Sequence, residues 1–326
     1  MPSYLLKKSI HFLALMVAVT ALAFTLVNLS PVDPVSAYIG TDTRIGLEQR
    51  EAIAHRFGLD KSPVDRFGFW LNNIIHGNWG ESLIFREPVT SVIGKRFWPS
   101  LALMGGAWFF SGVIGFTLGL AAGFKQNSWL DRLLSGYAYF LASTPTFWVG
   151  ILLLMLFSVK LGLTPICCAW PVGLQAGQAT LGQKFHHLLL PMMTLSIVGI
   201  SAIILHTRQK VIDLMKSDFS VFAQAQGVPP LRFLVTQGLK HVSIPAITVH
   251  LASFGELFGG SILAEQVFSY PGLGQAAVMA GIRGDTPLLL GITICSALFI
   301  YFGNTVADLS YRLLDPRIKL EGVAIS

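Results

Sequence analysis

The stretch RQKVIDLMKSDFSVFAQAQGVPPLRFLVTQGLKHVSIP, residues 208–245, decides how the rest of this chain is interpreted. It is polar, it is centred on Gly227, and a long apolar run lies on each side of it. A polar segment built as helix, glycine and helix, which begins and ends at a membrane, is suited to contact with a partner in water. Its charged and amide residues include Arg208, Lys210, Asp213, Lys216, Asp218, Gln224, Gln226, Arg232, Lys240 and His241.

Outside this segment the chain is strongly apolar. Of the 326 residues 53% are hydrophobic and 12% are charged, with a mean hydropathy of +0.62, whereas about 25% are charged in soluble domains. Each of six runs offers about the 20 residues that a helix needs to cross a bilayer. We therefore expect an all-α integral membrane protein with six transmembrane helices. The runs are 9–32, 97–124, 133–159, 185–207, 241–264 (interrupted by Glu256) and 286–307.

The first run has some features of a secretory signal. Lys7 and Lys8 precede it, and residues 35–37 form a passable cleavage site. The run 9–32 is longer than the core of about 7–15 residues that is typical of signal peptides. An uncleaved first helix is the prediction, and cleavage is the alternative.

Basic residues in the short loops predict the orientation, because they resist translocation. With the N-terminus inside, twelve basic residues lie on the cytoplasmic side, and only Lys160, Lys184 and Arg283 lie in short outer loops. Segment 31–96 carries eight more, but loops longer than about 60 residues count little. Both termini are therefore predicted to be cytoplasmic. This asymmetry accounts for the net charge of +6, and nothing indicates a nucleic-acid partner.

The predicted organisation has four parts: an N-terminal transmembrane helix (1–32), a periplasmic cap segment (33–96), a core with five transmembrane helices (97–312) and a cytoplasmic tail (313–326). The cap contains one expected helix, 47–57, which Gly58 would end. The apolar spacing of Trp70, Ile74, Ile75 and Trp79 suits packing against a membrane or other helix ends.

Two places depart from plain spanning helices. Pro145 lies inside the third run, where proline removes one backbone donor; a kink that lines a cavity and an ordinary packed kink are both open. Residues 269–274 have turn chemistry and precede a short apolar run, 275–282. That run is too short to span, so we expect a surface or re-entrant helix.

Ordered motifs along the chain resemble the permease subunits of binding-protein-dependent ABC importers of the dipeptide, oligopeptide and nickel family. No single motif is decisive, but the combination is highly specific. The motifs before the core are Asp33-Pro34, Phe57-Gly58-Leu59-Asp60 with Pro63, Gly77-Asn78-Trp79-Gly80-Glu81-Ser82 and Pro99-Ser100-Leu101. Those toward the C-terminus are Gly259-Gly260, Glu265, Phe268, Pro271-Gly272-Leu273-Gly274, Asn304, Asp308 and Asp315-Pro316-Arg317.

Segment 208–245 resembles the element through which such permeases couple to their ATPases. The residues that carry this likeness are Arg208, Asp213, Asp218, Phe219, Ala223, Ala225, Gly227 and Pro245. Gln224, Gln226 and Gln237 replace the basic residues and the histidine usual in the family, which bears on the strength or partner choice of docking. The helix over 218–227 would sit in a groove of the ATPase, with Ala223 and Ala225 allowing close contact.

The resemblance implies a transport subunit of the bacterial inner membrane that is not itself an enzyme and has no cofactor. The sequence agrees, since it has no phosphate loop of the G-x-x-x-x-G-K-[ST] type, so another chain must hydrolyse ATP. The implied partners are a second homologous permease, two ABC ATPase subunits and a solute-binding protein, which the segment 33–96 would help to dock.

Two glutamates fall inside the fifth run. Glu256 lies near its middle, where a carboxylate costs at least about 2.5 kcal/mol unless it is paired or hydrated. It would face the substrate path or form a hydrogen-bonded contact between subunits. Glu265 lies near the outer end and fits a structural role better. Together with Pro145 and His250 they form the tentative substrate path.

The glutamate motif also bears on the substrate. Gly255-Glu256-Leu257 followed by Gly259-Gly260 resembles nickel permeases more than peptide permeases. The expected substrate is therefore nickel, another divalent metal or a metal chelate, with di- or oligopeptides as the alternative. An ion-coupled secondary transporter that uses Glu256 as a proton relay is the alternative from another class.

Metal ligands are not identified by the sequence. His186, His187, Cys167 and Cys168 are of types that bind late divalent metals, although paired histidines at a helix start are also common as interfacial or capping residues. The only other cysteine is Cys295. The three cysteines predict no disulfide framework, and Cys167 and Cys168 are expected to be thiols.

Overall fold

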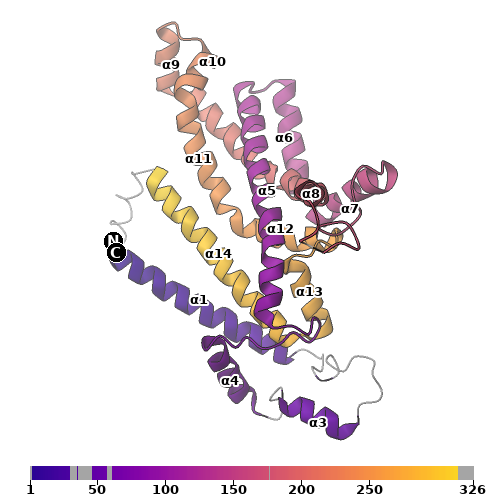
Figure 1. Cartoon of the computed structure of the whole chain (residues 1–326). Coiled ribbons are helices and arrows are strands. Elements are labelled where there is room, and N and C mark those ends of the chain that lie inside the picture. The colour runs from indigo at the N-terminus through magenta and orange to yellow at the C-terminus, as the bar shows by residue number, and fades with distance from the viewer. Residues whose placement is uncertain (1, 30–34, 36–45, 57–60, 176, 315–326) are drawn as a thin grey trace. The chain divides into compact units, whose positions relative to one another are not determined.

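The computed structural model describes residues 2–29, 35, 46–56, 61–175 and 177–314 (Figure 1). Within these ranges the chain is helical and has no named strand, only an isolated bridge between Glu81 and Pro88. The all-α prediction is confirmed. The predictions on Asp33-Pro34, Gly58 and the tail beyond residue 314 lie outside the described residues.

The helices follow one another along the chain as shown in Figure 1. They are α1 (Pro2–Leu29), α3 (Leu47–Arg56), α4 (Pro63–Ile75), α5 (Val89–Phe124), α6 (Trp129–Ala142), α7 (Thr146–Leu153), the π-helix η1 (Leu154–Lys160), α8 (Leu181–Met215), α9 (Asp218–Ala225), α10 (Pro230–Phe233), the π-helix η2 (Leu234–Gly238), α11 (Leu239–Ala252), α12 (Phe254–Val267), α13 (Leu273–Arg283) and α14 (Thr286–Leu314).

Four helices are long and apolar enough to cross a membrane on their own: α1, α5, α8 and α14. Two bent pairs meet the same criterion together. Residues 129–160 bend by 107° and residues 230–267 by 51°. If each bent pair counts as one span, the described residues contain up to six, one for each apolar run.

The bend in residues 129–160 corrects the expectation of a kink at Pro145. The helix ends at Ala142, and Pro145 is the N-cap of a new helix, with φ −62° and ψ 134°. Thr144 Oγ1 donates 2.7 Å to the Phe140 carbonyl, and proline offers no N–H to continue the ladder. Residues before proline also avoid the helical region, so the chain breaks rather than kinks.

The polar segment begins inside α8 rather than after it. α8 runs without interruption to Met215, so Arg208 and Asp213 occupy its last turns. The separate short helix is α9, which starts at Asp218 after the N-cap Ser217. The expected short helix after the turn at 269–274 is present as α13.

The chain divides into two compact units, and the divisions fall inside α5, between α12 and α13, and inside α14. The first unit comprises residues 1–98 and 271–301. Its core joins the start of α5 to α13 and α14, and Trp79 packs against it. The buried members of this core are Val89, Val92, Leu273, Ala276, Ala280, Leu288 and Ile292.

A buried aspartate fastens the segment before α5 to the start of α14. Asp285 is fully buried and accepts from Ser82 Oγ at 2.5 Å and from the Ile84 N–H at 3.0 Å. Its other carboxylate oxygen accepts from the Leu288 N–H at 3.2 Å, which caps a helix start with a negative charge. Ser82, the last residue of the motif 77–82, therefore has a structural role in this contact.

The second unit comprises residues 99–270 and 302–326. Its core packs residues of α5, α8 and α12 together with the loop before α8. α6, α7, α11 and α12 all contact α8, which makes α8 the central helix of this unit.

α5 lies against α8 along a row of glycines spaced four residues apart, Gly115, Gly119 and Gly123. A Cβ on them would approach the Cβ atoms of Ile203, Thr207 and Val211 to 2.8, 2.6 and 2.6 Å, respectively. Real Cβ atoms do not come so close, so only glycine permits this contact.

Candidate functional site

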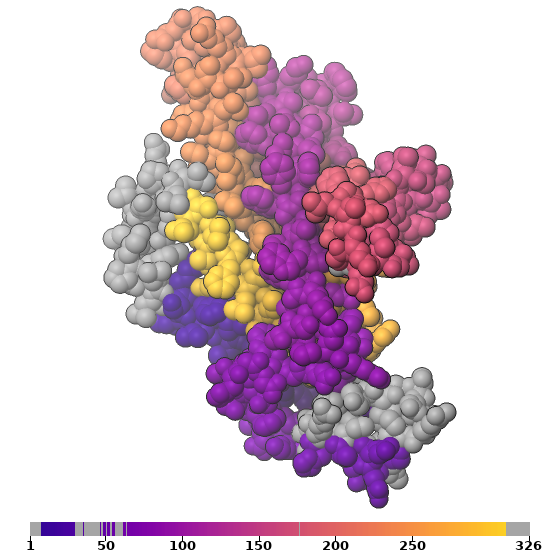
Figure 2. All heavy atoms as spheres, in the orientation of Figure 1, coloured from indigo at the N-terminus to yellow at the C-terminus, as the bar shows by residue number. Residues whose placement is uncertain are grey.

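α9 has one face on its own protein and one face open. Ser220 is fully buried and Ala223 is 5% exposed, whereas the larger Phe222 and Val221 are 63% and 59% exposed. In Figure 1 α9 and α10 lie together at the ends of α8 and α11, and Figure 2 shows the same part of the surface in orange. Ala223 therefore packs inward, and the open face consists of Phe219, Val221, Phe222, Gln224 and Ala225.

Gly227 ends this element in the left-handed region, with φ +81°. Its N–H donates to the Gln224 carbonyl at 2.9 Å, and the Val228 N–H donates to the Ala223 carbonyl at 3.1 Å. The glycine satisfies carbonyls that the helix end would leave unpaired. The expectation of a sharp glycine turn here is confirmed.

An aromatic contact holds α9 against the following helices. The Phe219 ring lies 5.0 Å from the ring of Phe233, which is fully buried, and 5.7 Å from that of His241. Asp218 is exposed, and Asp213 is exposed but accepts from Gln209 Nε2 at 2.8 Å. Pro245 lies inside α11.

Arg208 makes an ion pair within its own chain. Arg208 Nε donates to Asp131 Oδ1 at 2.5 Å, and Arg208 Nη2 donates to Asp131 Oδ2 at 2.8 Å. Asp131, in the first turn of α6, is 2% exposed. The sequence analysis grouped Arg208 with the coupling residues but did not identify this partner, which lies 77 positions away.

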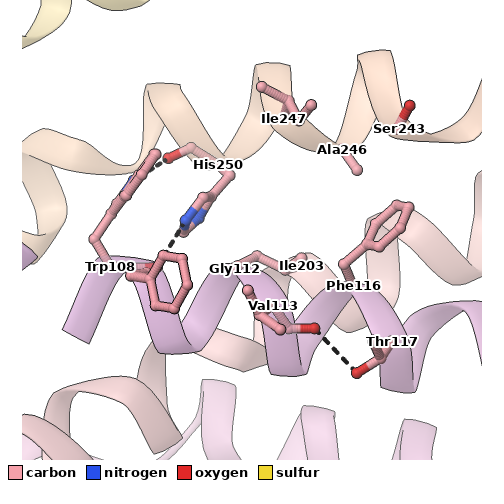
Figure 3. Close-up of a pocket in the computed structure, with 11 residues that line it drawn as sticks. Trp108, Gly112, Val113, Phe116, Thr117, Ile203, Ser243, Ala246, Ile247 and His250 are labelled. Carbon is pink, nitrogen blue, oxygen red and sulfur yellow. Dashed lines mark hydrogen bonds between the residues drawn. The ribbon is translucent and has the colours of Figure 1, made fainter. Parts of the chain in front are cut away.

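α5 and α11 enclose a cavity of about 320 Å³ with an almost entirely apolar lining (Figure 3). Ile203 of α8 contributes to its wall. Pro145 does not line it, so the cavity-lining interpretation of Pro145 gains no support here. Trp108 of α5 and His250 of α11 also line it.

His250 and Trp108 form a reciprocal pair at this cavity. Their rings stack with centroids 4.4 Å apart and planes at 14°. His250 Nε2 donates 2.9 Å to the Trp108 carbonyl, and Trp108 Nε1 donates 3.2 Å to the His250 carbonyl. His250 Nδ1 is buried and has no hydrogen-bond partner among the described residues. His250 thus belongs to a packed pair rather than standing alone in an open path.

The two glutamates of α12 differ sharply. Glu265 is fully buried and accepts from Ser100 Oγ at 2.5 Å, in agreement with a structural role. The neighbouring Tyr270 lies between α12 and α13, and burial, together with Glu265, raises the pKa of its phenol. Glu256 is exposed in the first turn of α12, directly after the break at Ser253.

The expectation that Cys167 and Cys168, in the loop before α8, are thiols is wrong. Cys167 and Cys168 are joined by a disulfide, and Cys168 has φ 75°. His187 Nδ1 lies 2.9 Å from the Cys167 carbonyl, and His186 Nε2 lies 2.9 Å from the Leu163 carbonyl. These ring nitrogens thus hold the loop. In the described residues no group of three or more His, Cys, Asp and Glu side chains could hold a metal ion.

The described residues form an all-helical chain with several apolar helices of spanning length. A family model described as "Binding-protein-dependent transport system inner membrane component" matches residues 115–320. The chain belongs to this family and is a multi-pass protein of the inner membrane.

Named relatives cover nearly the whole chain. It is 32% identical to the di/tripeptide transport system permease protein DppB of Pseudomonas aeruginosa, over 92% of this chain and 94% of that protein. It is 30% identical to the glutathione transport system permease protein GsiC of Salmonella typhimurium, over 98% and 99%. It is 28% identical to the oligopeptide transport system permease protein AppB of Bacillus subtilis, over 98% and 100%.

A solved structure shares the fold. The chain is similar to a chain of the MetNI methionine ABC transporter in an inward-facing conformation, with a TM-score of 0.54 and 16% identity, over 69% of this chain and 97% of that chain. The expected resemblance to dipeptide and oligopeptide permeases is confirmed. The expected closeness to nickel permeases is not supported, since the relatives above are named for peptides and glutathione.

Proposed function

We propose that this chain is one permease subunit of an ATP-driven importer for short peptides, including peptide-like thiols such as glutathione. Partner proteins carry out the other two steps of import: a pair of ABC ATPases hydrolyses ATP, and an outer solute-binding protein delivers the substrate. A second, homologous permease completes the path.

The open face of α9 is the observation that carries this proposal. Three apolar side chains, Phe219, Val221 and Phe222, are exposed on a helix of eight residues that is flanked by exposed polar groups. Exposed apolar clusters with a polar rim are typical of protein contacts. A permease without a nucleotide site needs such a surface to receive movement from an ATPase.

The topology that fits this role places α9 and both termini in the cytoplasm. All six spans cross the membrane, with the bent pairs as single spans. Residues 33–96 then lie outside, where α4 offers an exposed Phe69 and Val64 to the binding protein. Proteolysis of this segment in spheroplasts should be slowed by the loaded binding protein, and cleavage only from the cytoplasmic side would contradict the topology.

Peptides replace metal as the proposed substrate for two reasons. The relatives are named for peptide, dipeptide or glutathione transport. In addition, Glu256 offers a single exposed carboxylate, which suits the ammonium group of a peptide better than a metal ion, because a metal site needs several convergent ligands. Glu256 therefore stays in the proposed substrate path.

Reconstitution tests this function. The permease pair with its ATPases in lipid vesicles is supplied with binding protein and with labelled trialanine, labelled glutathione or radioactive Ni²⁺. ATP-dependent, vanadate-sensitive uptake of either peptide is expected. Uptake of Ni²⁺ but of neither peptide would indicate that the substrate is a metal. Uptake that continues without ATP and collapses with a protonophore would support the ion-coupled alternative.

A further inference from the structure

The Asp131–Arg208 ion pair joins the start of α6 to the last turns of α8. Asp131 is almost completely buried, and the side chain of Arg208 is 23% exposed. The carboxylate lies 77 positions from the guanidinium in sequence. Because the two residues are so far apart in sequence, their contact at the α9 end of α8 fixes the position of α6 relative to α8.

The carboxylate of Asp131 accepts four hydrogen bonds from three residues. Arg208 binds both oxygens in the fork geometry that makes arginine pairs directional. The Asn127 N–H donates to Oδ2 at 2.9 Å, and Ser135 Oγ donates to Oδ1 at 3.2 Å. Ser128 caps the same helix start by accepting from the Asp131 N–H at 3.2 Å. Two of the three guanidinium nitrogens are thereby used within the chain.

Apolar packing extends the same connection along the helices. Ala138 and Leu141 of α6 are buried against Ile200 and Ile204 of α8. On another side of α8 the glycine row of α5 excludes even a methyl group. The ion pair is the polar end of this packing, and it also holds the turn at Asn127 and Ser128 that joins α5 to α6.

We propose that Arg208 is a positioning residue: it makes α6 follow α8 when the ATPases displace α9. It would then act through Asp131, not by touching the ATPase. The movement would continue through α6 to the 107° bend before α7. This inference rests on the proposed function, because it assumes that α9 receives the ATPase movement.

The test uses the complete transporter in lipid vesicles, with whichever of the three probes the wild type takes up. The variants are Arg208→Met, Asp131→Asn, their combination and Arg208→Lys. Lys210→Met is the matched control, since Lys210 is an exposed cation two positions along α8. The readouts are ATPase copurification, ATP hydrolysis and uptake per ATP hydrolysed.

Both single variants should keep their ATPases and hydrolyse ATP, while uptake per ATP falls about tenfold or more. The combination should be no worse than either single change, because both remove one shared interaction. Arg208→Lys should be intermediate, since lysine cannot bind two oxygens in a planar fork. Lys210→Met should match the wild type.

Hydrogen exchange adds a readout that loss of stability alone would not produce. ATP with vanadate should change amide exchange at both α9 and residues 139–148 in the wild type, and only at α9 in Arg208→Met and Asp131→Asn. If the change at 139–148 persists in these variants, the positioning role is wrong.

Two further outcomes would overturn the inference. If Arg208→Met releases the ATPases while Asp131→Asn keeps them, Arg208 is a direct contact. If both variants transport like the wild type, the pair has no part in coupling. A wild type that neither binds the ATPases nor takes up any probe would refute the proposed function first, and this inference with it.

Discussion

α5 meets two of its neighbours, α8 and α11, in opposite ways. Against α8 its glycines leave no room for a methyl group. Against α11 it leaves a cavity of about 320 Å³, beside a buried histidine nitrogen without a hydrogen-bond partner in the described part of the chain. Both neighbours are helices of the same apolar protein, so the difference comes from side-chain volume along each contact.

The α11 side of the second unit is irregular. α11 follows the π-helix η2, contains Pro245 and ends at a break, where α12 departs at 51°. π turns and prolines weaken the regular ladder of helix hydrogen bonds. α9 is joined to α8 at one end and to α10 at the other.

The largest effect is expected where the tight contact is broken. Gly119→Val would bring a Cβ to 2.6 Å from Thr207 Cβ and 2.9 Å from the Ile204 carbonyl, which is backbone and cannot rotate away. Overpacking of this kind costs about 1–3 kcal/mol and occasionally more, so the yield of folded protein and its melting temperature in detergent should fall.

Gly105→Val is the control for that change, because Gly105 lies in the same helix and a Cβ there meets nothing within 4 Å. It should melt close to the wild type. If Gly119→Val and Gly105→Val have the same melting temperature, the α5–α8 contact can accommodate a larger side chain. It is then no tighter than the α5–α11 contact.

Gly227→Val should come next, with its effect on coupling rather than folding. The left-handed backbone at Gly227 would impose strain of about 1–2 kcal/mol or more on a β-branched residue. We expect insertion into the membrane, weak ATPase attachment or futile hydrolysis, and uptake reduced about tenfold or more.

Gly136→Val provides the comparison for Gly227, since Gly136 is exposed, has an ordinary φ and has no atom near its missing Cβ. Copurification and uptake should then match the wild type. Normal uptake with normally attached ATPases in Gly227→Val would remove α9 as the coupling helix.

The two glutamates of α12 sharpen the comparison by separating transport from stability. Glu256→Gln should lower uptake several-fold while assembly and basal ATP hydrolysis persist. The reason is that the Glu256 side chain is exposed directly after the break at Ser253, so its loss should affect the proposed substrate path rather than packing. Glu265→Gln should instead lower stability by about 1.5–3 kcal/mol, the range for hydrogen bonds to charged groups, since Ser100 binds its buried carboxylate. Failure of Glu256→Gln to assemble would make Glu256 a packing residue.

The smallest effect is expected at the loose contact. Trp108→Phe removes the indole donor to the His250 carbonyl, but Ser253 Oγ still donates to the same oxygen at 2.9 Å. The cost should be about 0.5–1 kcal/mol, near the net value of one neutral hydrogen bond, as measured by melting. A loss as large as that of Gly119→Val would mean that α5 is held as firmly by α11 as by α8.

Much of the helical plan could be predicted from the sequence, because apolar runs of spanning length have few alternatives to helix. The glycine turn at Gly227 was also predictable, since its polar setting between apolar runs required a reversal. These features depend on local sequence alone.

Contacts between distant residues could not be predicted in the same way. Ser128 followed by Asp131 is a recognisable helix start, yet nothing local identifies Arg208 as the partner of that aspartate. The exposure of Glu256 depends on the break at Ser253, and the burial of Ala223 depends on how α9 packs against α8 and α10. The disulfide between Cys167 and Cys168 joins adjacent residues, and because such bridges are rare, the adjacency alone favoured two thiols.

The contact between Ser82 and Asp285 has a consequence for the order of biosynthesis. The first unit needs residues 271–301, but these leave the ribosome only after the whole of 99–270. At about 5–20 residues per second, Ser82 and the Ile84 N–H must wait on the order of 10–40 seconds for the carboxylate that binds them. The early segment of the chain therefore stays without its buried carboxylate until the start of α14 has been made, and a chain that stops before residue 285 would leave Ser82 and the Ile84 N–H without this partner.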